Sequence, residues 1–213
     1  MDKVIGITGI ISGLMCALAD TPLAYFFDEK NQKIGKRRDI QTGWQTASSK
    51  RFYLSFLLSF LGQPGCYLVM WRLAEIIGKG NETMCSILKI CTFLGCYTGL
   101  ITHAVFCIKP LVYKHICQEA SLQSSENALH ETGRLTILPV LVCSITLVMI
   151  PAFLISAAIW QGILPVSRLW IILNPVFLMI AMLAVKKAFP KLPMIGFMGT
   201  GFIVYSALLL TIS

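Results

Sequence analysis

The sequence predicts an all-α protein: a polytopic transmembrane helical bundle with six spans, forming a single domain over residues 1–213. One observation behind this prediction is that 56% of the residues are hydrophobic and only 13% are charged, whereas soluble proteins carry about 25% charged residues. The other is the presence of six apolar stretches, each long enough to cross a bilayer, which takes about 20 helical residues. These observations exclude a soluble enzyme, a disordered protein and a typical nucleic-acid-binding protein.

The expected spans are continuous in their apolar character, which is typical of helices rather than of the alternating strands of an outer-membrane barrel. We place them at about Val4–Phe27, Phe52–Ile77, Met84–Ile108, Thr136–Trp160, Trp170–Phe189 and Leu192–Ile212. Proline inside a helix removes a backbone hydrogen bond and bends the helix. We therefore expect kinked helices in the second, fourth and fifth spans, at Pro64, Pro151 and Pro175.

The distribution of positive charge predicts the orientation of the chain. Thirteen of the 18 Lys and Arg residues fall in or beside the first, third and fifth connections, and five fall on the opposite side. Because Lys and Arg concentrate in cytoplasmic loops, we expect these three connections in the cytoplasm and both termini outside. The net charge of +8 then reflects topology. Contact with anionic lipid headgroups is an alternative for the basic segment Lys33–Arg38, and we expect no nucleic-acid partner.

Few ionisable residues lie inside the spans, and such residues are candidates for function because the bilayer disfavours them. Asp20 lies in the first span and His103 in the third, both in the half nearer the basic loops. Counting the helical rise from each span end places the two at comparable depth. A carboxylate and an imidazole at one depth can form a hydrogen-bonded acid–base pair. The alternatives are that Asp20 satisfies backbone groups freed by Pro22 and that His103 is an isolated core residue.

Two further pairs of polar residues occur in the second span. Gln63 and Tyr67 are four residues apart and share one helical face, where they can bind a ligand, or Gln63 can fill the gap left by Pro64. Arg72 and Glu75 are three apart near the outer end. They can form an ion pair at the interface, which we favour, or contact a substrate.

The fourth and fifth spans meet near a third group of candidates. Asn174 precedes Pro175, and its amide can cap exposed carbonyls or bind a ligand. Together with Trp160 and Trp170 it could rim a pocket on the outer side.

Other polar and small residues have simpler interpretations. The eight cysteines form no CxxC pair and lie almost entirely in apolar spans, so we expect buried thiols. In the third connection His115 and Glu119 have helical spacing, but a single His-x-x-x-Glu is weak evidence, and we predict neither a metal nor another cofactor. The Gly9-x-x-x-Gly13 and Gly95-x-x-x-Gly99 patterns predict close helix packing. They make direct contact between the first and third spans plausible, and they leave oligomerisation possible.

Several short features in order resemble an uncharacterised family of small bacterial six-span integral membrane proteins. They are Ala19-Asp20, Gly62 to Tyr67, Gly99…His103-Ala104 and Gly162…Pro165…Trp170…Asn174-Pro175. The resemblance implies architecture and a location in the bacterial plasma membrane, and it implies no activity.

These features favour a protein that binds or transforms a lipid-like or apolar small molecule in an intramembrane pocket. Asp20 and His103 would act as the acid–base pair, with membrane lipids as the surrounding partners. One alternative is a small proton-coupled transporter or channel, in which the same pair relays protons. Another is a non-catalytic membrane partner or immunity-type subunit, in which the polar residues only join helices. Whether the protein is an enzyme stays open at this point.

Overall fold

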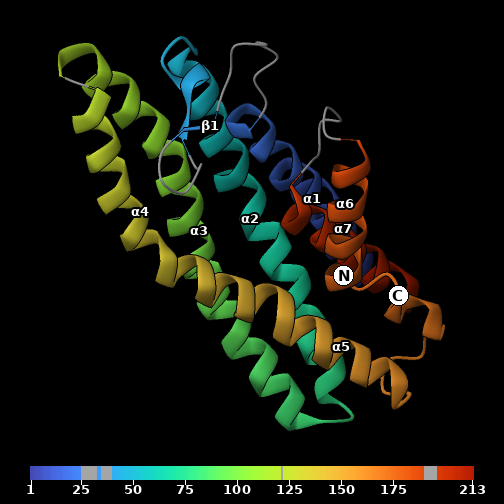
Figure 1. The fold of residues 1–213 in the computed structure, drawn as a ribbon. Coiled ribbons are helices and arrows are strands. Elements are labelled where there is room, and N and C mark those ends of the chain that lie inside the picture. Colours follow the sequence, from blue (N-terminus) through green and yellow to red (C-terminus); the bar gives the residue numbers. More distant parts are fainter. Residues whose placement is uncertain (25–32, 35–39, 121, 190–195) are drawn as a thin grey trace.

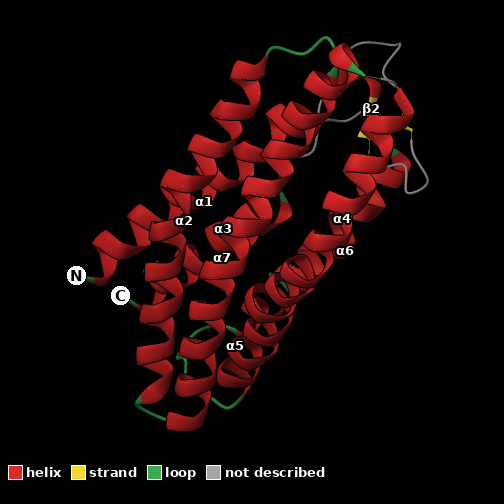
Figure 2. Ribbon diagram, turned by 90° about the vertical axis from the view of Figure 1, so that its left-hand side faces the viewer, coloured by secondary structure: helices red, strands yellow, loops and turns green. Residues whose placement is uncertain are grey.

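The computed structural model describes residues 1–24, 33–34, 40–120, 122–189 and 196–213. The helices are α1 (Asp2–Ala24), α2 (Ser49–Gly78), α3 (Glu82–Glu119), α4 (Leu122–Ser144), α5 (Ile150–Trp160), α6 (Pro175–Ala188) and α7 (Phe197–Ile212). Beside them stand one antiparallel pair of two-residue strands, β1 (Lys33–Ile34) and β2 (Ile40–Gln41). Figure 2 shows that helices make up nearly all of the described chain, so the predicted all-α class is confirmed.

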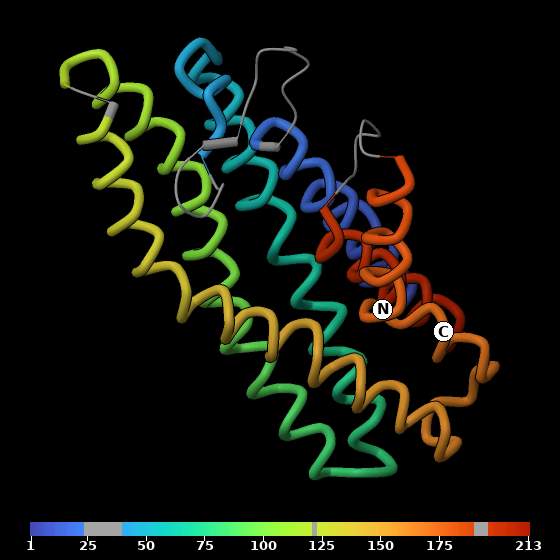
Figure 3. The backbone as a smooth tube through the Cα atoms, in the orientation of Figure 1, coloured from blue at the N-terminus to red at the C-terminus, as the bar shows by residue number. Residues whose placement is uncertain are grey.

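Within the described residues, four helical segments are long and apolar enough to cross a membrane: Asp2–Leu23, Ser49–Gly78, Glu82–Glu119 and Gln123–Trp160. The last joins α4 and α5 through a π-helical turn at Ile145–Met149, and Figure 3 traces it as one continuous helical path. Helices α6 and α7 have 14 and 16 residues, which span only about 21–24 Å of a hydrocarbon core about 30 Å thick. The membrane character therefore rests on four helices, and six spans remain a prediction.

The fifth helix differs from its prediction. Helix α6 begins at Pro175, and Trp170 lies before it in a short 3-10 turn at Arg168–Ile171. Proline is favoured in the first turn of a helix, where its missing N–H has no helical partner. Pro175 thus starts a helix instead of kinking one. Pro64, by contrast, lies inside α2, and Pro151 lies in the first turn of α5, just after the π-helical turn.

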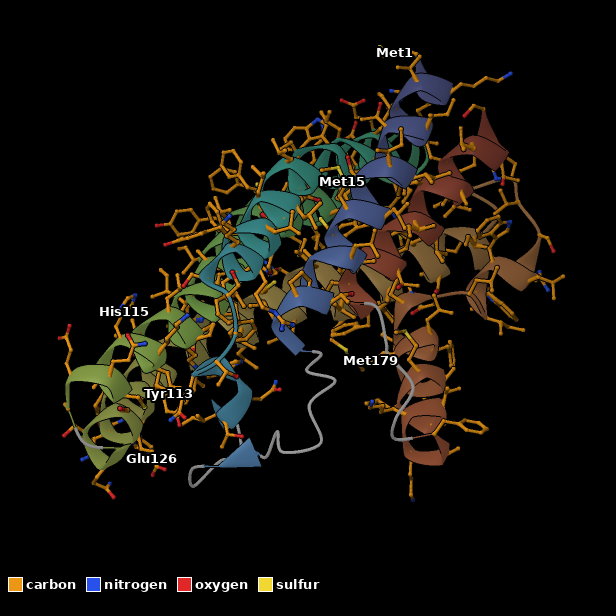
Figure 4. All side chains as sticks on the ribbon, turned by 90° about the horizontal axis from the view of Figure 1, so that it is seen from above. Met1, Met15, Tyr113, His115, Glu126 and Met179 are labelled. Atoms are coloured by element: carbon orange, nitrogen blue, oxygen red, sulfur yellow. The ribbon has the colours of Figure 1, made fainter. Side chains whose placement is uncertain are left out.

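The third connection, the long polar segment between Lys109 and Leu135, is almost entirely helical, in keeping with the helical spacing of His115 and Glu119. Helix α3 continues to Glu119, and α4 starts at Leu122. Both extensions are amphipathic, and the apolar side of each is buried. Tyr113 and Leu129 lie there in a small core with Trp44 and Phe52. Tyr113 meets Trp44 edge to face with ring centroids 6.0 Å apart, at the end of the molecule where Figure 4 labels Tyr113, His115 and Glu126.

The helices run back and forth, with α2 between α1 and α3 (Figure 1). Helix α1 packs on α2 and α7, whereas α3 packs on α2 and α4. The main core lies where α2, α3, the π-helical turn, α5 and α7 meet, and it includes Met70, Leu147, Ile155 and Phe202. This arrangement brings α1, α3 and α7 around the middle of α2, and the candidate site lies there.

Candidate functional site

A cavity of about 210 Å³ lies between α1, α2, α3, α7 and the junction of α4 with the π-helical turn. Four of the nine site residues predicted from the sequence line it: Asp20, Gln63, Tyr67 and His103. Its other walls are mainly apolar, formed in part by Phe106, Val140, Leu147, Met198 and Phe202. The structure thus gathers residues from three separate helices around one space.

Asp20 and His103 are neighbours in the wall of this cavity. His103 Nδ1 lies 3.7 Å from Asp20 Oδ1, with the imidazole largely buried and the carboxylate about half exposed. The structure therefore places the two side chains next to one another, as their comparable depth predicts. The route is not the expected packing of the first span on the third, because α2 lies between α1 and α3.

The start of α7 helps to hold Asp20 in place. Gly196 N donates to Ala17 O at 2.8 Å, which fastens the residue before α7 to α1. A Cβ on Gly196 would clash with the Asp20 carboxylate, so a larger residue there would force the carboxylate to move. The glycine thus lets the start of α7 pack closely against Asp20.

Ser55 on α2 contacts His103 on the side of the ring away from Asp20, and it is not among the residues singled out from the sequence. Its side chain is completely buried. Its Oγ donates to Ala19 O at 2.7 Å and lies 3.1 Å from His103 Nε2. The thiol of Cys107 also donates to this Oγ, at 3.4 Å. Ser55 thus ties α1, α2 and α3 together at the level of Asp20.

A second polar row runs along α2 into the cavity. Tyr67 OH donates to Gln63 Oε1 at 3.0 Å, and Gln63 Nε2 donates to Ser59 Oγ at 2.9 Å. The predicted shared face of Gln63 and Tyr67 is confirmed by this bond. Gln63 is bonded to side chains rather than to backbone beside Pro64, so it does not fill the gap left by the proline. Gly99 on α3 leaves room for the Tyr67 hydroxyl, which lies 3.0 Å from where a Cβ would be.

Thr102, next to His103 on α3, also lines the cavity. It is 8% exposed, and its hydroxyl has no hydrogen-bond partner among the described residues. Thr92 and Thr98 on the same helix each donate to the carbonyl four residues earlier. Thr102 therefore keeps an unused hydrogen-bonding group in the wall of the cavity.

Arg72 and Glu75 lie outside the cavity. They form the predicted ion pair, with Arg72 Nη1 2.8 Å from Glu75 Oε2. Arg72 also binds Asp2 through two bonds, Nε to Oδ1 at 2.8 Å and Nη2 to Oδ2 at 3.0 Å. The guanidinium thus anchors the beginning of α1 to the end of α2, and the favoured structural interpretation fits.

The residues predicted to rim an outer pocket have other roles. Asn174 Oδ1 accepts from Val176 N at 2.8 Å, which caps α6, while its Nδ2 donates to Ala152 O and Ser156 Oγ, both at 2.9 Å. The void that Asn174 and Trp170 line has a volume of about 10 Å³, enough for about one water molecule. Trp160 is 64% exposed, and the Arg168 guanidinium lies over its ring, with Cζ 4.5 Å from the ring centroid. Among the described residues, the void beside Asn174 and Trp170 is too small for a ligand.

The glycines of the two Gly-x-x-x-Gly patterns pack against other parts of the same chain. A Cβ on Gly13 would meet Ile203 and the carbonyl of Gly199 on α7, and one on Gly95 would meet Leu147. Across the described ranges, no cluster of three or more His, Cys, Asp or Glu side chains could hold a metal ion.

The sequence matches the model of a family of unknown function (DUF6796) over residues 1–213, and the chain belongs to that family. The expected membership of an uncharacterised family is thereby confirmed, while a bacterial source stays a prediction. No curated protein and no solved structure matches the chain.

Proposed function

We propose that this member of the family is an integral membrane protein that binds a lipid-like or apolar small molecule in the cavity between α1, α2, α3 and α7. Asp20 and His103 would serve as its acid–base pair, able to orient or transform the ligand. The observation that supports this proposal most is the convergence of Asp20, His103, Gln63 and Tyr67 on one largely apolar space. A mainly apolar space with a few convergent polar groups is typical of a small-molecule site.

The size of the cavity suggests the size of the ligand. A dry apolar cavity of about 150 Å³ binds benzene, which has six non-hydrogen atoms. By simple proportion, 210 Å³ holds about eight such atoms. The partly exposed lining residues include Asp20, whose side chain is 45% exposed, and Phe106, which is 39% exposed. A longer chain could therefore leave the cavity on their side, with only its polar end enclosed.

We also propose six spans with both termini outside and the Asp20 end of the cavity toward the cytoplasm. The division of the basic residues, 13 against five, supports this orientation. Attachment of a membrane-impermeant thiol reagent to single cysteines would test it. A cysteine at position 46, before α2, should react only after the membrane is opened, and one at position 80, after α2, should react in intact cells. The reverse pattern would contradict the orientation.

The binding function is tested by native mass spectrometry of the purified protein, with extraction and identification of co-purified molecules. Ser144→Phe would fill the cavity, because Ser144 lines it. Thr211→Phe is the matched control. Both hydroxyls donate to the carbonyl four residues earlier, and Thr211 is exposed. We expect the wild type and Thr211→Phe to carry the same ligand and Ser144→Phe to lose most of it.

Asp20→Asn and His103→Ala extend this test to the polar pair. Both variants should change the amount or identity of the bound molecule. A wild-type protein without any bound small molecule, or an identical profile in all variants, would count decisively against the proposal.

A further inference from the structure

The His103 ring has two edges with different surroundings. Its Nε2 lies 3.1 Å from Ser55 Oγ and 3.3 Å from Ser55 O. The carbonyl can only accept a hydrogen bond. The Ser55 hydroxyl has one proton, which goes to Ala19 O over the short distance of 2.7 Å. Both groups facing Nε2 are therefore acceptors, and Nε2 must carry a hydrogen.

The exchangeable proton of the ring is consequently on the other nitrogen. Nδ1 lies 3.7 Å from Asp20 Oδ1, which is too long for a direct hydrogen bond. With Nε2 protonated, the Nδ1 and carboxylate atoms hold one proton between them in the electrically neutral pair. Loss of this proton would leave an uncompensated carboxylate beside an apolar cavity, which is unfavourable. The pair thus presents a single donor proton at the cavity.

Other titratable groups near the pair lie on α1, α2, α3 and α4. Cys16 on α1 and Cys143 on α4 line the cavity, and Cys107 on α3 donates to Ser55. On α2, Tyr67 donates to Gln63, and Arg51 Nε donates to Pro22 O at 2.7 Å, near the end of α1. Among the described lining residues, Asp20 carries the only carboxyl group and His103 the only imidazole.

We infer that the cavity takes a neutral molecule with a carbonyl oxygen, which accepts a hydrogen bond from the proton that the Asp20–His103 pair holds. Ser55 is the positioning residue that keeps this proton on the cavity side of the ring. A carbonyl oxygen offers lone pairs and no proton, so it complements the donor that the pair presents. An anionic ligand would meet the Asp20 carboxylate, and an ammonium would displace the proton that already neutralises it. This inference rests on the proposed binding function.

The position of the proton can be measured directly. Histidine occurs three times in the chain, so His115→Gln with His130→Gln leaves His103 as the sole ¹⁵N-histidine signal in nanodiscs. We expect Nε2 to stay protonated throughout a pH titration and only Nδ1 to gain or lose its proton. Ser55→Ala removes one of the two acceptors at Nε2, and it should introduce a fraction of the other tautomer. A bare Nε2 beside a protonated Nδ1 in the otherwise wild-type protein would overturn the inference.

The ligand class is tested with four probes of about the size that the cavity volume suggests: 2-octanone, octane, octanoate and octylamine. We expect 2-octanone to bind about tenfold more tightly than octane, the worth of one hydrogen bond to a charged or strongly polar donor. Ser55→Ala should reduce this preference while octane binding persists. Cys107→Ala is the matched control, because it removes another partner of Ser55 Oγ without touching His103, and it should keep the preference.

The outcomes separate the two proposals. Equal affinity for 2-octanone and octane, or tighter binding of either charged probe, would overturn the carbonyl inference and leave the binding function standing. Binding of none of the four probes to the wild type would contradict both.

Discussion

Helix α2 carries two polar sites that differ in how completely their bonds are used. Near its start, Ser55 meets the Asp20–His103 pair, and this group is called the cavity site. Near its end, Arg72 binds Asp2 and Glu75, and this group is called the anchor site. In the anchor site the three bonds of the guanidinium measure 2.8–3.0 Å. In the cavity site the Nδ1–Oδ1 distance is 3.7 Å beside an open space.

The comparison shows that a charge within an apolar helix does not by itself indicate a ligand site. The anchor site uses its charges to join two helix ends, and Asn174 likewise uses its amide within the fold. The cavity site has bonding capacity that its neighbours do not use, next to a void. Substitutions at the anchor site and at Asn174 should therefore reduce stability and leave ligand binding intact. Substitutions at the cavity site should weaken ligand binding and change stability little.

The largest expected loss of stability is at Asn174. Asn174→Ala removes a helix cap worth about 1 kcal/mol and two side-chain donations worth about 1 kcal/mol each. We expect a loss of about 3 kcal/mol, visible as a lower Tm in thermal unfolding in detergent. Asn127→Ala, at an exposed position on α4, should have little effect. A stable Asn174→Ala protein that has lost its ligand would place Asn174 among the binding residues.

A smaller loss of stability is expected at the anchor site. Arg72→Met keeps the apolar stem but leaves Asp2 and Glu75 without their shared partner. Because partly exposed ion pairs contribute modestly, we expect Tm to fall by about 2–4 °C, with ligand occupancy unchanged. Lys3→Met, which removes a cation from an exposed position at the same end, is the control. Equal Tm values for the two variants would show that the anchor site contributes nothing measurable.

The cavity site was partly foreseeable from the sequence, because helix geometry fixes depth. The rise per residue placed Asp20 and His103 at one level, and the four-residue spacing placed Gln63 with Tyr67. Ser55 was not foreseeable, since a serine in an apolar helix is unremarkable until the carbonyl opposite it is known. The same holds for Asp2, which meets Arg72 across 70 positions of sequence.

The long apolar helices could be predicted from the sequence, because their length and hydropathy determine them. The points where helices start and end could not, because they depend on local hydrogen bonds and on tertiary packing. Asn174-Pro175 fits both a kink within a helix and the start of one, and hydropathy cannot distinguish them. The capping bond to Val176 N selects the start. The polar residues between Lys109 and Leu135 are too hydrophilic for a span, and hydropathy alone does not show that they are helical. They form amphipathic helix ends whose apolar faces find a second core.

The sharpest contrast uses one substitution at the two sites of α1. Asp20→Leu keeps roughly the shape of the side chain, has no polar hydrogen and breaks no hydrogen bond within the described residues, so Tm should change by less than about 2 °C. It removes the shared proton, and binding of 2-octanone should fall about tenfold. Asp2→Leu removes both acceptors that Arg72 binds and should lower Tm without affecting binding. If both variants behaved alike, the distinction between the two sites would be lost.

The smallest expected effect, and one of opposite sign, is at Thr102. Its hydroxyl is buried without a hydrogen-bond partner among the described residues, and a buried unsatisfied polar group lowers stability. Thr102→Val replaces the hydroxyl with a methyl group of similar size, so the ligand-free protein should be unchanged or more stable by about 1 kcal/mol. Thr92→Val, which removes a bonded hydroxyl on the same helix, should be destabilising by a similar amount. Equilibrium unfolding with and without 2-octanone provides the measurement. If Thr102→Val loses stability only when the probe is present, the hydroxyl is a second donor to the ligand oxygen, and the cavity site extends one residue further along α3.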